Sequence, residues 1–492
     1  MSAFESLKRL ATEAAIVSSS ASVLGWDQET YLPEQAHDWR ARQLSWLAGR
    51  SHELSTSKEL GDALKAALDE TDSSDERTLG NLREMQRRFD RSTKLPASLV
   101  EKNSEISSRS KHAWATARKT SDFSLFAPHL QSVLDISREK AELWGYQDEP
   151  YDALIETYER GATTASVSRI FDELGPDLRN IAAAAVARTE AKPAKLPEGP
   201  YPIDQQMSFN EKVARSFGFD FDRGRIDTTT HPFCTTLGPD DIRLTTRYEV
   251  SDFTSSLLGV LHEAGHGLYE QGLRAGDFGQ AAGDSVSLGI HESQSRLWEN
   301  HVGRSREFWA HWLPVAAEHF PQLKNTDLND FLAYIHRAEF SFIRVESDEA
   351  TYDLHILLRF ELERRLMRDE MKVADVPAAW NEAFEKSFGL IPPDDAHGCL
   401  QDIHWSMGGL GYFPTYTLGN LNAAQLFAAS MRDGSIRSAF SKADYAPLLQ
   451  WLRAKVHDHG ATLEPSEIVK RATGSEPNAR AHLNHLRERY NR

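Results

Sequence analysis

Leu-His-Glu-Ala-Gly-His-Gly, residues 261–267, lies inside an amphipathic run that starts near Ser251. The apolar residues of this run are spaced as in a helix. On a helix, His262 and His266 project from one face a single turn apart, and two imidazoles placed in this way can bind one zinc ion. Glu263 lies about 100° round the helix from His262, where it can reach a metal-bound water without ligating the metal. The segment therefore predicts a catalytic metal site carried by a helix.

The same histidines also have a structural interpretation, in which they cap the helix or pack against its neighbours. Gly265 and Gly267 cost helix stability. Their expected benefit is room for the close approach of a backbone or a substrate. The helical context and the residues that follow favour the metal site over a packed pair.

A catalytic zinc usually has three protein ligands and one open position, so a third ligand must come from elsewhere. Glu270, one turn further along the helix, is expected to lie too far away. The metzincins would need a histidine at position 272, which is a glycine, so this class is excluded. After a glycine-rich loop, residues 289–300 predict a second helix that carries Glu292 and Glu299. From the residues alone, either glutamate is the third ligand or a charge on a helix surface.

The rest of the chain is mainly helical by its periodicity. Apolar residues recur three and four apart in residues 3–20, 34–55, 76–93, 123–144 and 165–188. Residues 225–248 are rich in β-branched side chains and predict a hairpin, the main β element. Residues 190–202 contain four prolines and predict an extended connector. We interpret this connector as a loop between two lobes of one domain that spans residues 1–492.

Composition narrows the possible partners. The chain of 492 residues has a formal net charge of −17, which argues against nucleic acid and against anionic membrane surfaces. Its two cysteines exclude a disulfide framework and fit a reducing compartment. We find no secretory signal and no run of apolar residues long enough to span a membrane. The cytoplasm is therefore the expected location.

Six motifs occur in an order that resembles the carboxypeptidase Taq family of metallocarboxypeptidases. They are His231-Pro-Phe233, Asp241-Ile-Arg-Leu-Thr245, His262-Glu-Ala-Gly-His266, His291-Glu-Ser-Gln294, Ile343-Arg-Val-Glu-Ser-Asp348 and Gly398-Cys-Leu-Gln-Asp-Ile-His-Trp405. Trp26-Asp-Gln28 and Gly411-Tyr-Phe-Pro-Thr-Tyr416 are also similar, so the resemblance spans nearly the whole chain. Two departures, Ser347 in place of the usual alanine and Arg160 where proline is common, touch no expected metal ligand.

The resemblance implies zinc on His262, His266 and Glu292, with Glu263 as the base, and it favours Glu292 over Glu299. It implies a mainly α fold with a deep active-site groove, similar to neurolysin and angiotensin-converting enzyme. Family members are commonly homodimers and often accept cobalt in place of zinc. The implied activity is that of a zinc metallocarboxypeptidase, which releases single amino acids with broad specificity from peptides that have a free C-terminus.

Amide hydrolysis also needs donors that stabilise the tetrahedral oxyanion. His404 and Tyr416 are our candidates, with Tyr412 as the alternative, although Tyr416 is almost equally well explained as a packed core residue. An extended peptide could add to the edge of the hairpin as a further strand, with His231 near the groove. The other interpretation of His231 is that Pro232 holds it in a turn.

A carboxypeptidase must recognise a terminal carboxylate, which the planar guanidinium of arginine binds bidentately. Arg344 and Arg243 both lie in family motifs. We favour Arg344, because Arg243 has a ready partner in Asp240 or Asp241. The alternative for Arg344 is an ion pair with an acid of its own motif, Glu346 or Asp348.

Two other functions compete with this one. The nearer is a different specificity in the same groove, such as that of an endopeptidase or a dipeptidase. The more distant is a scaffold or chaperone that keeps the metal for structure alone. The intact Glu263 argues against the second, because a structural metal site needs no base.

Overall fold

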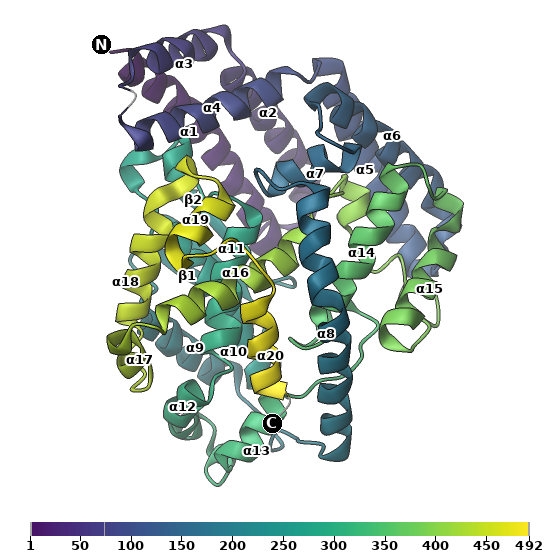
Figure 1. The fold of residues 1–492 in the computed structure, drawn as a ribbon, viewed down its shortest axis with the longest axis vertical. Coiled ribbons are helices and arrows are strands. Elements are labelled where there is room, and N and C mark those ends of the chain that lie inside the picture. The colour runs from purple at the N-terminus through teal and green to yellow at the C-terminus, as the bar shows by residue number, and fades with distance from the viewer. Residues whose placement is uncertain (1, 73, 491–492) are drawn as a thin grey trace. The chain divides into compact units, whose positions relative to one another are not determined.

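The computed structural model describes residues 2–72 and 74–490, and the mainly helical fold predicted from the periodicity is confirmed (Figure 1). Its α-helices are α1 (Ala3–Thr30), α2 (His37–Ser55), α3 (Lys58–Glu70), α4 (Glu76–Thr93), α5 (Ala97–Thr120), α6 (Ala127–Trp144), α7 (Pro150–Tyr158), α8 (Thr164–Ala191), α9 (Ile203–Phe217), α10 (Phe253–Glu270), α11 (Leu288–Arg296), α12 (Arg306–His319), α13 (Leu328–Ile335), α14 (Tyr352–Met367), α15 (Val376–Phe388), α16 (Pro414–Ser430), α17 (Gly434–Phe440), α18 (Ala446–Lys455), α19 (Pro465–Thr473) and α20 (Arg480–Tyr490).

The chain forms two compact units, and each unit is built from three separate segments. Unit 1 consists of Met1–Ser92, Lys195–Ile335 and Asn422–Pro477, and unit 2 of Thr93–Ala194, His336–Leu421 and Asn478–Arg492. Each has its own hydrophobic core, with Trp298 and Trp309 fully buried in unit 1 and Tyr151 and Trp380 buried in unit 2. The proline-rich stretch between α8 and α9 contains no helix or strand, and the chain passes from unit 2 to unit 1 within it.

The β-rich segment of unit 1 forms three strands rather than a simple hairpin. They are β1 (Gly224–Thr228), β2 (Cys234–Gly238) and β3 (Asp241–Thr246), in the spatial order β1-β3-β2. β2 and β3 are antiparallel and form the expected hairpin, whereas β1 pairs parallel with β3, with Ile226 opposite Leu244. Strand propensity is local and does not specify a partner, so the pattern alone could not reveal this parallel pairing. The order leaves β2 at the edge of the sheet.

α10 and α11 carry the residues predicted to bind the metal. α10 begins after Asp252, whose carboxylate accepts a hydrogen bond from the Thr254 N–H at 2.8 Å and so caps the helix. α10 packs against β3 on one side and against α11 on another, and α10 and α11 lie close together in Figure 1. α11 runs directly into a π-helical turn, η5 (Leu297–Val302), all of whose residues are buried.

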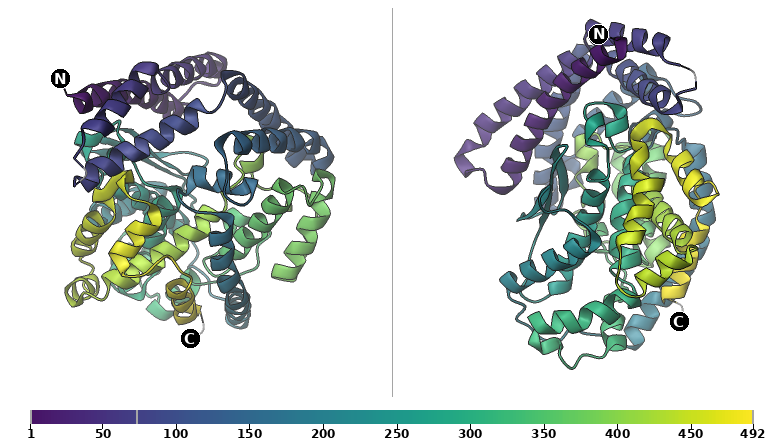
Figure 2. Two further views of the ribbon diagram at one scale, coloured as in Figure 1. Left: turned by 45° about the horizontal axis from the view of Figure 1, so that its top comes forward. Right: turned by 90° about the vertical axis from the view of Figure 1, so that its left-hand side faces the viewer.

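Helices α1, α3 and α4 add a smaller hydrophobic cluster to unit 1. Leu7, Leu60, Leu64 and Leu82 form its centre. α1 and α2 are long and pack along one another, as the right-hand view of Figure 2 shows. Among residues 2–72 and 74–490, no helix combines the length and the apolar character that a membrane crossing requires.

Candidate metal centre

Two imidazoles and one carboxylate converge between α10 and α11. The ligand atoms of His262, His266 and Glu292 all lie within 4.8 Å of one another. Glu292 Oε2 is 3.7 Å from His262 Nε2 and 3.4 Å from His266 Nε2. α10 presents both histidines because they are four residues apart, and the return of the chain in α11 brings Glu292 to them. The structure thus brings together the three residues that the family resemblance implies as ligands.

The Nδ1 atoms of the two histidines contact other side chains and not Glu292. His262 Nδ1 lies 2.9 Å from Glu299 Oε2, and His266 Nδ1 lies 2.5 Å from His291 Nδ1. His291 Nε2 lies 2.8 Å from a carboxylate oxygen of Glu270, so it can donate to Glu270 while His291 Nδ1 accepts from His266. In this tautomer, both Nε2 lone pairs face the gap beside Glu292. Such outer contacts orient metal-ligating histidines.

Arginines neutralise the two glutamates of α11 and η5. Arg296 donates to Glu292 Oε1 at 2.7 Å and to Glu299 Oε2 at 3.2 Å, and Arg304 donates to Glu299 Oε1 at 3.2 Å. Burial disfavours the charged carboxylates, but Arg296 and the neighbouring histidines outweigh it. The pKa of Glu292 is held well below its ordinary value, and that of Glu299 falls to about 2. Both carboxyls are therefore ionised at neutral pH.

This donor set fits a divalent cation of the zinc type. Zinc ligands lie about 2.0–2.2 Å from the ion in a tetrahedron, which places ligand atoms about 3.3–3.6 Å apart. The distances of 3.4 and 3.7 Å are close to this spacing. Burial lowers the pKa of His266 to about 4, so this imidazole is neutral. At His262, burial is outweighed by Glu292 and Glu299, which raise its pKa to about 8, so a cation must displace a proton there.

Glu263 lies beside this cluster on α10 and is only 6% exposed. Burial is the main reason why its pKa rises to about 7, with attraction to His262 acting against the rise and repulsion from Glu292 adding to it. A carboxyl group with a pKa near neutrality can both take up and release a proton at working pH. Glu263 therefore has the properties of a general base.

Gly265 allows α10 and α11 to approach closely. A Cβ atom at this position would lie 2.6 Å from both the carbonyl oxygen of Gln294 and the Cα of Ser295, which are backbone atoms of α11. A Cβ at Gly267 would instead meet side-chain atoms of Phe219 and Leu244. The expected close approach of a backbone is therefore confirmed at Gly265.

Replacing Gly265 with alanine should push α11 away from α10, because a backbone cannot rotate aside. We expect the free energy of unfolding to fall by about 1–3 kcal/mol, the usual effect of overpacking. Chemical denaturation measures this loss, and titration with zinc should show weaker binding. Gly259→Ala is the matched control on α10, because its Cβ would meet only Thr246 Oγ1 at 3.4 Å. Equal losses in the two variants would contradict the explanation.

Arg344 belongs to a buried polar cluster of unit 2. Its Nη2 and Nε donate to Asp402 Oδ1 at 2.8 and 3.1 Å, and its Nη1 donates to the Tyr352 hydroxyl at 2.8 Å. The other oxygen of Asp402 accepts from Arg359. The ion-pair partner of Arg344 is thus Asp402 rather than an acid of its own motif. Two guanidinium groups share one carboxylate, so these three side chains carry a net positive charge.

The candidate oxyanion donors gather beside Arg344 in the same unit. His404 Nε2 lies 3.3 Å from the Tyr416 hydroxyl, and the rings of Tyr412 and Tyr416 are 5.4 Å apart. The guanidinium carbon of Arg344 lies 4.9 Å from the centre of the Tyr416 ring. Buried Glu363 holds this loop in place, since it accepts hydrogen bonds from the Gly411 N–H at 2.9 Å and from Trp405 Nε1 at 2.7 Å.

The two candidate residues of the sheet region differ in their surroundings. His231 is exposed in the loop before β2. Arg243 lies on β3, where its Nε and Nη2 each donate to one oxygen of Asp241 at 2.8 Å. Its guanidinium carbon also lies 4.2 Å from the centre of the Trp26 ring. Of the two possible partners of Arg243, the structure thus selects Asp241.

The sequence did not reveal which side chains contact the Nδ1 atoms of His262 and His266. Glu299 appeared only as a competing ligand, yet it lies seven residues after Glu292, two turns along the same helix face. Its position relative to Glu292 was therefore a usable signal for a carboxylate behind His262. Glu270 follows His266 by four residues and is anchored by the Thr236 hydroxyl at 2.8 Å. No sequence spacing indicated that His291 would connect Glu270 with His266.

Comparison with known proteins agrees with this geometry. The sequence profile of the carboxypeptidase Taq (M32) metallopeptidases matches residues 6–490. Thermostable carboxypeptidase 1 of Thermus thermophilus is 38% identical over 502 residues, which cover 99% of this chain and 98% of the relative. Carboxypeptidase 1 of Bacillus subtilis is 34% identical over 489 residues, covering 99% and 97%. The solved M32 carboxypeptidase of Deinococcus radiodurans R1 is 38% identical and superposes with a TM-score of 0.95, covering 99% of this chain and 98% of that one.

The fold and the site thus define a metallopeptidase of the helical class. The chain belongs to the carboxypeptidase Taq family, so it is a metallocarboxypeptidase, a peptide hydrolase.

Proposed function

We propose that the cation is zinc, held by His262, His266 and Glu292, and that the enzyme removes single residues from the C-terminus of peptides of varied sequence. The observation that carries this proposal is the cluster of two imidazoles and one ionised carboxylate, with a buried glutamate beside it. Cobalt has the same preference for nitrogen and oxygen donors and should substitute for zinc. Metal analysis of protein purified without added metal tests the assignment of zinc.

In this proposal, Glu263 takes a proton from the attacking water and passes it to the leaving amine as the C–N bond breaks. A divalent cation in the site would polarise the scissile carbonyl and make the water more acidic. Glu299 and His291 hold the ligand histidines in position and do not touch the substrate. The burial of Glu263 keeps its basicity high enough for this task at neutral pH.

Tyr416 and His404 are proposed to donate hydrogen bonds to the oxyanion, with Tyr412 as the alternative donor. Tyr416→Phe removes one hydroxyl and leaves the ring in its packing, so kcat should fall by about 10²–10³-fold with little change in KM. Steady-state kinetics on a blocked dipeptide measures both constants. Tyr412→Phe removes the hydroxyl of the alternative donor in the same cluster and is therefore the matched comparison for Tyr416→Phe. A change confined to KM would make Tyr416 a binding or packing residue.

We further propose that Arg344 recognises the terminal carboxylate of the substrate. Its cluster with Asp402 and Arg359 keeps one positive charge in excess, which an anionic group can offset. Arg243 is already held bidentately by Asp241, which makes it the weaker candidate. His231, exposed before the edge strand β2, is proposed to lie beside a peptide that pairs with that edge.

Terminal blocking of one peptide tests the activity and this role together. Amidation of its C-terminus should nearly stop cleavage, whereas acetylation of its N-terminus should change the rate little, as followed by mass spectrometry with and without chelator. Arg344→Ala should lose the preference for a free carboxylate and keep the cation, and Arg243→Ala should retain that preference. Efficient internal cleavage of an amidated and acetylated peptide would instead identify an endopeptidase.

We also propose that the protein is a homodimer that acts in the cytoplasm as one catalytic domain. Trp39 and Trp46 lie two turns apart on one face of α2 and are 64% and 69% exposed, as in an apolar surface that a second copy would cover. Both cysteines are free thiols, in keeping with a reducing compartment. Neither compact unit is a continuous piece of chain, which supports a single domain. A monomeric mass in sedimentation equilibrium would refute the dimer.

A further inference from the structure

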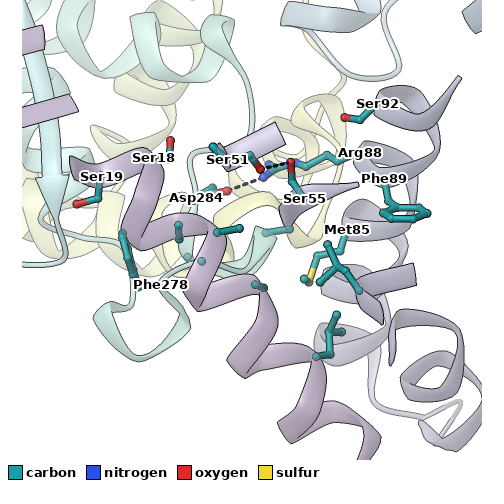
Figure 3. Close-up of a pocket in the computed structure, with 18 of the residues that line it drawn as sticks. Ser18, Ser19, Ser51, Ser55, Met85, Arg88, Phe89, Ser92, Phe278 and Asp284 are labelled. Atoms are coloured by element: carbon teal, nitrogen blue, oxygen red, sulfur yellow. Dashed lines mark hydrogen bonds and ion pairs between the residues drawn. The ribbon is translucent and has the colours of Figure 1, made fainter. Parts of the chain in front are cut away.

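A cavity of about 640 Å³ lies within unit 1 (Figure 3), and its lining includes none of the three proposed metal ligands. Its walls come from α1 to α4 and from the loop of residues 278–285, and Thr236 and Glu270 also line it. Pockets of this size are typical of sites that take small ligands. None of the functional roles described above makes use of this cavity.

The cavity is connected to the metal centre through a short chain of contacts. Glu270 bonds Thr236 through one carboxylate oxygen and His291 through the other, each at 2.8 Å. His291 in turn contacts the ligand His266 at 2.5 Å. Glu270 itself lines the cavity, so only the side chain of His291 stands between the cavity lining and His266.

The cavity also lies beside the end of β2, which is one of the two edge strands of the sheet. Thr236 belongs to β2, whose other neighbour in the sheet would be an added peptide. One residue further on, the Ser19 hydroxyl of α1 donates a hydrogen bond to the Leu237 carbonyl oxygen. α1 thus occupies the edge at Leu237, and a peptide paired with β2 must leave the strand there. The cavity is the space next to that point.

The lining suits a peptide of mixed sequence. The charged groups are already paired, because Arg88 binds both Asp284 and Glu84, and Glu270 has the two partners described above. Serine hydroxyls of α1 and α2 line one part of the cavity, and Leu7, Leu64, Met85 and Phe89 line another. Hydroxyl groups can bond peptide N–H and C=O groups, and the apolar part can cover side chains of varied shape.

We propose that this cavity binds the amino-terminal part of a peptide substrate, several residues upstream of the bond that is cleaved. The proposal rests on the proposed function and extends it, since it assigns a second binding region to the same substrate. Binding energy gained far from the reacting bond can raise the rate of reaction there. The cavity therefore makes long peptides better substrates than dipeptides.

A cavity-filling substitution tests this extension. Ser18 lines the cavity on α1, whereas Ser20, two residues away and exposed, does not line it. For the wild-type enzyme, kcat/KM should rise with substrate length in a series of peptides of two to seven residues that all end in the same two residues. Ser18→Trp should lower kcat/KM by about tenfold or more for the longest peptides and leave kcat/KM for the blocked dipeptide unchanged. Ser20→Trp should retain the full rise. An equal loss at every length, or no loss, would overturn the proposal.

Photocrosslinking separates this proposal from the proposed function, because it needs no turnover. Peptides of three to seven residues with a benzoylphenylalanine at the first position are irradiated with the zinc-loaded Glu263→Gln protein. Mass spectrometry should place the crosslinks of the longer peptides in residues 7–22, 51–64, 85–92 or 278–285, and Ser18→Trp should suppress them. Crosslinks confined to other residues refute the cavity site even if the enzyme is a carboxypeptidase. Absence of C-terminal release with crosslinks in the cavity refutes only the proposed function.

Discussion

Glu263→Gln is expected to retain the cation and to lose turnover by about 10²–10⁴-fold, the usual contribution of a general base. The amide has the size of the carboxyl group but cannot accept the proton of the attacking water. Glu263 is not one of the three clustered donors, so the cation should remain. Atomic absorption gives the metal content, and kcat on a blocked dipeptide gives the loss.

The control for this experiment is the thermal unfolding of the same variant. An unchanged transition together with full metal content would assign the lost activity to the missing base. Turnover close to that of wild type in a metal-replete Glu263→Gln protein would disprove the role of Glu263.

Glu292→Ala is expected to abolish cation binding at micromolar metal, whereas Glu299→Ala should weaken it by about 10–100-fold. The first change removes a ligand atom that lies 3.4 Å from His266 Nε2 and 3.7 Å from His262 Nε2. The second removes only the hydrogen-bond partner of His262 Nδ1. Both residues are buried and both bind Arg296, so each variant is a matched control for the other.

Isothermal titration with zinc measures both affinities directly. If Glu299→Ala lost the cation while Glu292→Ala kept it, the roles of the two glutamates would be reversed. Comparison of the two unfolding curves shows whether either effect comes from a general loss of structure.

Local pattern predicted much of the helical structure. α4 spans Glu76–Thr93, the range predicted from its periodicity, and α2 begins three residues later than predicted and ends where predicted. Periodicity works here because each helix buries one face, and that face repeats along the sequence. The parallel pairing of β1 with β3 was beyond such reasoning, since it joins segments that only tertiary packing brings together.

The residues of the metal centre likewise differ in how well the sequence predicts their positions. His262, Glu263 and His266 could be predicted because their geometry is internal to one helix. The choice of Glu292 over Glu299 required the family resemblance, because the glycine-rich loop before α11 does not determine where that helix lies. The positions of Glu270 and His291 behind His266 depend on side chains from two helices and a strand, so no spacing in the sequence reveals them.

The division of each compact unit among three chain segments has a consequence for synthesis on the ribosome. The core of the first unit includes Leu452 and Ile468, and the core of the second includes Leu483 and Leu486. A nascent chain that has reached residue 421 therefore lacks part of both cores. Its unfinished apolar surfaces stay open to chaperones until the last residues are added. A frameshift late in the coding sequence should then cost the cell the entire enzyme, and not merely its final helices.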